Sequence, residues 1–400
     1  MCEQKPLSGR QLAARIILAL GLALAFAGLS HAGPYLDSAH GDQSTGVLRT
    51  STAQYCRGNC AHCHEQHASV DDSEPIPRGG PDRYLLFEEN AAGQTDNFCF
   101  QCHVSAGGMQ SGGVPPNRSY SYTFGGHTAA GSYDSDIKDA FSHTNSGSSH
   151  YLPSIVSQVL GRTMYDAQNI PWSLPADLNP CDACHNPHLA QDNSPVSLAG
   201  GVLNTAVSRP SDHGSLLGDA ADERASAAGD YQAPFWFGRT DRFEPANDSV
   251  QDGSNLPDYN RLCTDCHNQY NTIYSENPRL PGTPRNLRKI NWTPVDGVVT
   301  ADAHGAYDGT PKRIQPPYSD NVSNITLGCL DCHEPHGSTT NIYLIRTSVN
   351  GAAVSLTAET DAQWLDFCQA SCHGSRHGSR HYNKRGCPGC HYHGASRGGF

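Results

Sequence analysis

The chain has 400 residues, of which 37% are hydrophobic and 16% are charged, and it contains 40 glycines and 26 prolines. Globular domains usually hold about 45–50% apolar residues, so the side chains alone offer too little apolar surface for one large core. The formal net charge of −12 excludes the basic surface typical of nucleic-acid binding.

The first predicted element is an export signal at residues 1–32. Three basic residues in the first fifteen positions precede an apolar run from Ile16 to Leu29, and small residues lead up to Ala32. The run is shorter than the roughly 20 residues that span a bilayer, which favours cleavage over a membrane anchor. No later stretch is apolar enough to cross a membrane. We therefore expect a secreted mature chain, 33–400, in the periplasm, at the cell surface or outside the cell.

Seven cysteine motifs follow along the mature chain. Six read Cys-x-x-Cys-His, and one carries an extra residue between its cysteines. We number them motifs 1 to 7 in chain order: Cys60–His64, Cys99–His103, Cys181–His185, Cys263–His267, Cys329–His333, Cys368–His373 and Cys387–His391. A lone Cys-x-x-Cys also occurs in zinc sites and redox dithiols. A histidine directly after every pair is instead typical of covalent c-type haem attachment.

The motifs therefore predict seven c-type haems, each bonded through two thioethers and ligated by the motif histidine. The attaching thiols are those of Cys60, Cys63, Cys99, Cys102, Cys181, Cys184, Cys263, Cys266, Cys329, Cys332, Cys368, Cys372, Cys387 and Cys390. The proximal ligands are His64, His103, His185, His267, His333, His373 and His391. For the stretched motif 6, a structural thiol pair is the alternative.

Cys56 is the one mature cysteine outside these motifs. We expect a buried free thiol there, with an intermolecular disulfide as the alternative.

The second axial ligand of each iron separates electron carriers from catalysts. Only two methionines remain after the leader, so histidines must serve most irons. A histidine three residues after a motif histidine cannot easily reach the far face of the same haem, and we expect it to serve the next one. The expected distal ligands are His67, His188, His336, His213, His304, His40 and His143.

Other histidines compete for these places. His127 and His150 compete with His143, and His377, His381 and His393 lie near the C-terminus. For His213 and His304 a surface-loop role is the alternative. His62, inside motif 1, is not expected to be a ligand.

Runs rich in Gly, Ser, Asn and Pro separate the motifs and predict loops. We expect one helix over Ala352–Phe367 and a short strand over Asn341–Arg346. The predicted fold is mostly irregular and loop-rich, with few short helices and minimal strand, and with the chain wrapped around a stack of seven haems as a single unit.

Three acidic residues lie inside motifs, namely Asp182, Asp265 and Asp331. Near a haem they would favour the oxidised iron and lower its reduction potential; the alternative is that they face solvent.

The chain resembles the exported multihaem c-type cytochromes of metal- and mineral-reducing bacteria. The resemblance rests on three phrases: the one ending at His67, Cys-His-Asn-Pro-His188, and Cys-Leu-Asp-Cys-His-Glu-Pro-His-Gly337. It implies closely stacked haems that carry electrons between the periplasm and outside acceptors. The implied partners are other redox cytochromes and extracellular electron acceptors. Some members polymerise into filaments whose haems continue between subunits, so the resemblance also implies a homopolymer in which a neighbour supplies one distal histidine.

The resulting prediction is an electron carrier and not an enzyme. One alternative is a multihaem reductase of the nitrite or hydroxylamine type, with one open haem. Relatives that reduce nitrite usually mark that haem with a lysine in place of the motif histidine, and this sequence has no such motif. The other alternative is a monomeric periplasmic electron shuttle.

Overall fold

The computed structural model describes residues 33–36, 38–65, 82–112, 136–142, 147–189, 207–213, 259–291, 311–312, 322–323, 328–349 and 352–373. The predicted leader, motif 7 (Cys387, Cys390 and His391) and the candidate ligands His67, His143 and His304 lie outside the described residues.

The helices of the described residues are short, and none exceeds eight residues. The α-helices are α2 (Gly33–Leu36), α4 (Ile137–Phe141), α5 (Leu152–Gln158), α6 (Tyr259–Cys266), α7 (Cys329–Cys332) and α8 (Asp361–Cys368). Single 3₁₀ turns cover Thr50–Thr52, Cys60–His62, Phe98–Gln101, Pro180–Ala183, Pro210–Asp212 and Ile342–Leu344. Because helices this short are marginal in isolation, the segments depend on tertiary contacts for their stability.

The described strands form five antiparallel pairs of two or three residues each. The pairs are β1 (Ser148–Ser149) with β8 (Gly337–Ser338), β2 (Thr163–Tyr165) with β3 (Pro171–Ser173), β4 (Tyr274–Ser275) with β5 (Arg285–Asn286), β6 (Pro311–Lys312) with β7 (Val322–Ser323), and β9 (Ser348–Val349) with β10 (Ala352–Ala353). The β1–β8 pair joins segments far apart in the sequence. Gly147, with a φ of 87°, leads into β1 where a Cβ would lie 2.0 Å from the Ser338 carbonyl oxygen, so glycine is required there.

Two local predictions differ from the structure. The helix expected over Ala352–Phe367 is correct only from Asp361 onward, where the Thr360 side chain accepts from the Gln363 N–H as a cap. Ala352 and Ala353, at the start of the expected helix, instead form β10 and pair with β9. The strand expected over Asn341–Arg346 is a tight turn, because Tyr343 and Leu344 take left-handed φ values of 58° and 61°.

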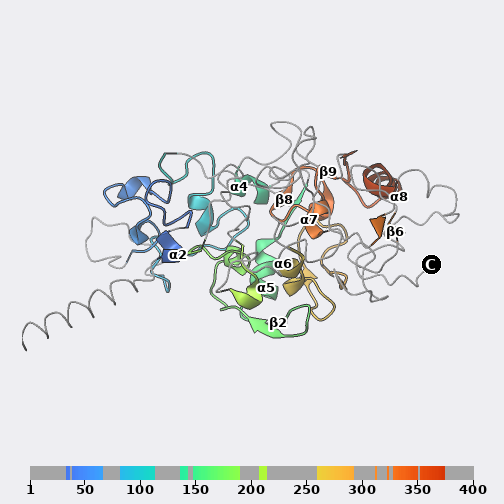
Figure 1. The fold of residues 1–400 in the computed structure, drawn as a ribbon, viewed down its shortest axis with the longest axis horizontal. Helices are drawn as coiled ribbons and strands as arrows, with labels where there is room; N and C mark the ends of the chain where they lie inside the picture. The colour runs from blue at the N-terminus through green and yellow to red at the C-terminus, as the bar shows by residue number, and fades with distance from the viewer. Residues whose placement is uncertain are drawn as a thin grey trace, which may run out of the picture.

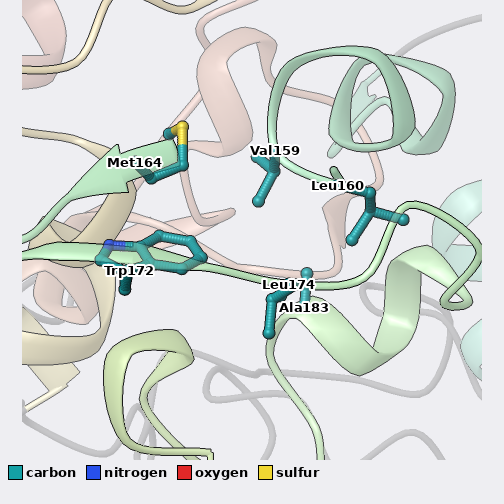
Figure 2. Close-up of a cluster of buried hydrophobic side chains, with 6 residues drawn as sticks. All are labelled: Val159, Leu160, Met164, Trp172, Leu174 and Ala183. Atoms are coloured by element: carbon teal, nitrogen blue, oxygen red, sulfur yellow. The ribbon is translucent and has the colours of Figure 1, made fainter. Parts of the chain in front are cut away.

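Three small apolar clusters replace a single large core among the described residues, and each contains or contacts a motif residue. In the first, Val159, Leu160, Met164, Trp172 and Leu174 pack on Ala183 of motif 3 (Figure 2). Cys266 of motif 4 packs against this cluster. In the second, Phe100 of motif 2 packs with Phe141 and Leu152. The third consists of Ile342, Ile345, Val349, Val354 and Leu356, and Cys332 of motif 5 and Trp364 and Phe367 of α8 pack against it. Met164 is thus a core residue.

The segments follow the long axis of the molecule roughly in chain order (Figure 1). The blue N-terminal segments lie at one end, α4, α5 and α6 lie in the middle, and the orange and red segments with α7 and α8 lie toward the other end. Whether the chain wraps around haems, as the fold prediction requires, stays a prediction.

Candidate functional site

Each of motifs 1 to 5 is wound into one tight turn. In all five, the histidine N–H donates to the carbonyl of the first cysteine at 2.8–3.0 Å. An asparagine just before motifs 1, 2 and 3 accepts a backbone N–H of the turn: Asn59, Asn97 and Asn179. Asparagine is among the best residues at such a cap. The local sequence therefore holds both thiols and the imidazole of each motif in a fixed arrangement.

The stretched motif 6 accommodates its extra residue in a π-helical turn. Helix α8 ends at Cys368, and Gln369–His373 continues as one π turn. In an α-helix, residues three apart are about 300° apart around the axis. In a π-helix of about 4.4 residues per turn, residues four apart are about 330° apart. The π turn thus brings Cys368 and Cys372 close to the angular relation of an ordinary Cys-x-x-Cys pair.

Burial raises the pKa of several motif thiols. The pKa is raised to about 12 for Cys63, first by burial and then by the thiols of motif 2. Burial and then Cys184 of motif 3 raise the pKa of Cys266 of motif 4. Burial and then Cys332 raise the pKa of Cys372. Reactive dithiols have lowered pKa values, so these surroundings do not favour redox or nucleophilic thiol chemistry.

The same neighbour relations indicate the order of the motifs in space. Cys63 of motif 1 lies near the thiols of motif 2, Cys266 of motif 4 lies near Cys184 of motif 3, and Cys372 of motif 6 lies near Cys332 of motif 5. The amide of Asn97 in front of motif 2 donates to Asn179 in front of motif 3 at 3.1 Å. The Cys329 N–H of motif 5 donates to Asn260 in α6, which contains the cysteines of motif 4, at 2.7 Å. Motifs 1 to 6 therefore follow one another in chain order.

Four motif histidines each face a histidine from outside the motifs. The ring centres are 6.0 Å apart for His64 and His188, 6.1 Å for His103 and His40, 5.9 Å for His185 and His336, and 6.3 Å for His267 and His150. Two imidazoles that bind one metal from opposite sides through bonds of about 2.0 Å have ring centres about 6.2 Å apart, because each centre lies about 1.1 Å from its nitrogen. All four separations match this spacing.

Backbone carbonyls set the tautomer of three imidazoles, those of His64, His40 and His333. Nδ1 of His64 lies 2.9 Å from the Tyr84 carbonyl oxygen, and Nδ1 of His40 lies 2.8 Å from that of Pro187. A carbonyl only accepts, so Nδ1 carries the proton and Nε2 keeps its lone pair. His333 makes the same bond to the Tyr343 carbonyl at 2.8 Å. Ligating histidines commonly show this arrangement.

Burial keeps several of these imidazoles neutral, as a metal ligand must be. The pKa of His336 is lowered to about 3 by burial and then by the neighbouring His185, His150 and His103. Burial, followed by His40 and His185, lowers the pKa of His103 to about 4. Nδ1 of His103 is buried with no hydrogen-bond partner.

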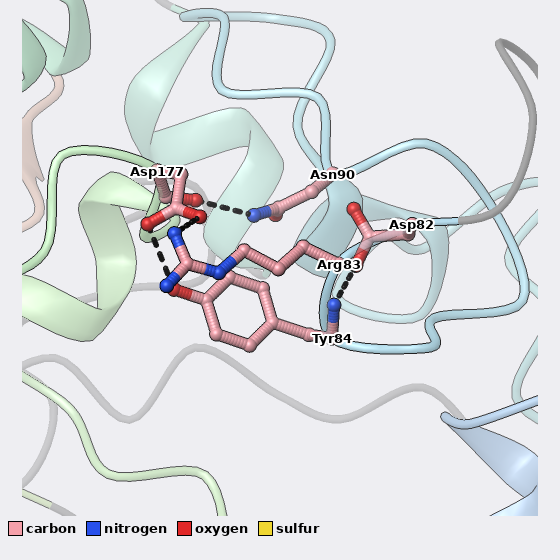
Figure 3. A network of polar contacts seen from close by, with 5 residues as sticks. All are labelled: Asp82, Arg83, Tyr84, Asn90 and Asp177. Carbon is pink, nitrogen blue, oxygen red and sulfur yellow. Dashed lines mark hydrogen bonds and ion pairs between the residues drawn. The ribbon is translucent and has the colours of Figure 1, made fainter.

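A polar network fixes the segment that orients His64 (Figure 3). The Tyr84 hydroxyl donates to Asp177 at 3.0 Å, and the Tyr84 N–H donates to Asp82 at 2.7 Å. Asn90 donates to the Asp177 carbonyl at 3.1 Å, and Arg83 pairs with the Asp177 carboxylate. Since Arg83 is exposed, this ion pair adds little stability. The network ties the segment beside motif 1 to residues just before motif 3.

Motifs 1 and 5 share a local repeat that the sequence analysis did not recognise. After motif 1 the chain reads Tyr84-Leu85-Leu86, and after motif 5 it reads Tyr343-Leu344-Ile345. In both, the tyrosine carbonyl accepts from the motif histidine and the leucine has a left-handed φ near 60°. In both, the next residue bridges back to the motif histidine. The Tyr-Leu dipeptide was the available signal.

The structure brings together some of the predicted ligands and leaves others apart. His40, His188 and His336 each face a motif histidine. His213 lies near motif 3, with Nδ1 3.1 Å from the Ser208 hydroxyl, and within the described ranges no motif histidine is in ring contact with it. His150 faces His267. From the sequence, His150 was expected only to compete with His143, and it was not among the seven expected distal ligands.

His188 and His336 do not face the histidine of the motif next in the chain. Each faces the histidine two motifs earlier, which is motif 1 for His188 and motif 3 for His336.

Two further residues, His62 and Cys56, have definite environments. Both ring nitrogens of buried His62 are engaged, Nδ1 by the Arg49 N–H and the Thr52 hydroxyl, and Nε2 by the Cys56 carbonyl. Cys56 is exposed, so the expectation of a buried thiol was wrong. It lies in a surface segment, which the sequence around it did not indicate.

Two of the three acidic side chains inside motifs, those of Asp265 and Asp331, are buried. The alternative that they face solvent is therefore wrong for these two. Asp265 accepts from the Ser211 hydroxyl at 3.0 Å, and burial raises its pKa to about 6. Asp331 accepts from the Gly328 N–H at 2.7 Å. Asp182 is half-buried, and burial likewise raises its pKa to about 6.

Within the described part of the chain, no group of three or more His, Cys, Asp or Glu side chains is arranged to hold a metal ion. A haem iron takes only two ligands from the protein, and each histidine pair consists of two imidazoles. Of the helices described, none is long and apolar enough to cross a membrane. No family model, no curated protein and no solved structure matches the chain.

Proposed function

We propose that the chain is an exported electron-transfer protein that binds c-type haem at its seven motifs. The observation that carries the proposal is the set of four histidine pairs, each with one motif member and a ring-centre separation of 5.9–6.3 Å. Bound there, c-type haem supplies a one-electron iron couple.

The chain's own residues then have definite roles. The motif thiols fix the cofactor covalently, and the motif histidines bind one side of each iron. His188, His40, His336 and His150 bind the other side at motifs 1, 2, 3 and 4, respectively. Two histidines per iron leave no position for a substrate, which favours electron transfer over catalysis.

The arrangement of motifs supports transfer along the molecule. Motifs 1 to 6 are neighbours in chain order, and the described segments follow the long axis (Figure 1). An electron entering at one end would thus pass successive sites toward the other end. A filament of such molecules would extend the same path between subunits.

Intact-mass measurement of the purified native protein tests cofactor attachment, with seven haems per chain expected. Six haems would show that motif 6 is empty, and none would refute the proposal.

Electron paramagnetic resonance tests the ligand pairs. The oxidised native protein should show low-spin signals from motifs 1 to 4. His336→Ala should convert one site to high-spin iron, whereas His62→Ala, the matched control, should convert none. An unchanged spectrum for His336→Ala would refute this pair.

The same spectrum distinguishes the reductase class, because one high-spin equivalent in the native protein would favour a catalytic site. Negative-stain microscopy distinguishes a filament from a monomeric shuttle. A field of monomers alone would exclude the filament.

A further inference from the structure

Motifs 3 and 5 are followed by the same kind of short segment. Asn186-Pro187-His188 follows the histidine of motif 3, and Glu334-Pro335-His336 follows that of motif 5. These segments make contacts that extend beyond their own motif.

The segment after motif 3 contacts the histidine pairs of the two preceding motifs. The His188 ring faces His64 of motif 1 at 6.0 Å. The Pro187 carbonyl accepts from Nδ1 of His40 at 2.8 Å, and His40 faces His103 of motif 2. One turn of backbone thus touches the sites of motifs 1, 2 and 3.

The segment after motif 5 repeats this arrangement. The His336 ring faces His185 of motif 3 at 5.9 Å. The Pro335 carbonyl accepts from Nδ1 of His150, and His150 faces His267 of motif 4. Two copies of one contact pattern, far apart in the chain, argue against a chance placement of either proline carbonyl.

The covalent structure makes the two contacts of each segment interdependent. The proline carbonyl and the nitrogen of the following histidine belong to one planar peptide unit, and the proline ring fixes its own φ. A displacement of the His188 backbone therefore moves the oxygen that orients His40. A hydrogen bond to Nδ1 sets the orientation and basicity of a ligating imidazole.

We propose, on the basis of the proposed function, that each segment is a coupling element, which means that it sets the ligand field of two sites at once. His188 ligates the site of motif 1 while the Pro187 carbonyl sets the distal ligand of motif 2. His336 and Pro335 do the same for motifs 3 and 4.

Asn186 is the positioning residue of the first segment. Its Oδ1 accepts from the His188 N–H at 3.1 Å, and its Nδ2 donates to the His213 carbonyl at 2.9 Å. The amide therefore holds the turn that carries both Pro187 and His188, without facing either histidine pair itself.

The test uses the full-length, haem-loaded protein and its low-spin paramagnetic resonance signals. His188→Met and His40→Met, each changing one signal, assign the signals of motifs 1 and 2. Asn186→Ala is then measured with all ligands in place, and both assigned signals should shift while the others stay. Gln363→Ala is the control, because the Gln363 amide likewise holds a turn by accepting from the Thr357 and Ala358 N–H groups at 2.8 Å, and it should leave both signals unchanged.

The outcomes separate the coupling from the proposed function. If neither methionine variant changes a signal, the ligand assignment itself is refuted. If both do, but Asn186→Ala shifts only the motif 1 signal or neither, the coupling is refuted. Asn186→Asp keeps the acceptor for His188 and loses the donor, so it should give smaller shifts and remains available if Asn186→Ala fails to fold.

Discussion

The asparagine bridge between motifs 2 and 3 yields a quantitative prediction. Asn97 is 1% exposed, caps the turn of motif 2 by accepting from the Cys99 N–H at 2.9 Å, and donates to Asn179 at 3.1 Å. Loss of the cap costs about 1 kcal/mol. Loss of the bridge costs about 0.5–1.5 kcal/mol more, because Asn179 Oδ1 keeps its bond from the Cys181 N–H at 3.0 Å. Asn97→Ala should therefore lower the free energy of unfolding by about 2 kcal/mol.

Asn59→Ala is the matched control, because Asn59 caps motif 1 in the same way but is exposed. It should cost about 1 kcal/mol. Asn97→Ser retains a capping oxygen but cannot reach Asn179, so it should fall between the two. Urea unfolding of the haem-loaded protein, followed by circular dichroism, measures all three.

A double-mutant cycle with Asn179→Ala isolates the bridge itself. Residues in direct contact usually show a coupling of about 0.5–3 kcal/mol. Additive costs for the two variants, or an Asn97→Ala cost no greater than that of Asn59→Ala, would refute the reasoning.

Three further predictions concern charge, acidity and reactivity. Arg49 is buried near the thiols of motifs 1 and 2, with its guanidinium 3.8 Å from the centre of the Phe87 ring. Because Arg49→Met removes a buried positive charge, it should lower the reduction potential of at least one haem in a spectroelectrochemical titration. Arg83 is exposed, so Arg83→Met should not lower it. Burial opposes ionisation of Asp136, but hydrogen bonds from Ser105 and Asp139 outweigh it and lower the pKa. The stabilisation that ionised Asp136 gives the fold is therefore present at pH values above the usual Asp pKa of about 3.9, and it is lost as the pH falls through the lowered pKa. Asp136→Asn should reduce the free energy of unfolding at pH 7, and an equal reduction in strong acid would contradict this. Cys56 should accept one alkylating label in the haem-loaded mature chain, and three labels by mass would mean that motif 6 is empty.

The seven motifs can be recognised in the sequence because each is local. Cys-x-x-Cys-His needs only five consecutive residues, and the structure winds five of the motifs into the same turn. The histidines that face the motif histidines are not local in this sense. His150 reaches His267 only because the intervening chain folds back, and no property of the residues near His150 distinguishes it from His143 or His127.

Local backbone details were equally hard to predict. The apolar residues Ile342, Tyr343 and Leu344 favour a strand by composition, yet the carbonyl that orients His333 requires a left-handed turn there. This conformation is required by the hydrogen bond to His333, which lies ten residues before Tyr343. Site geometry overrides local propensity at this point.

The alternating direction of the histidine pairs has a consequence for the order of assembly. His40 and His150 precede the motifs they face, whereas His188 and His336 come two motifs after theirs. As the chain emerges from its N-terminus, the partners for motifs 2 and 4 are already present when those motifs appear. Motifs 1 and 3 must wait for later segments. Under the proposed function, the irons of motifs 1 and 3 would therefore stay open longer during maturation than those of motifs 2 and 4, and they would be more exposed to stray ligands before the fold is complete.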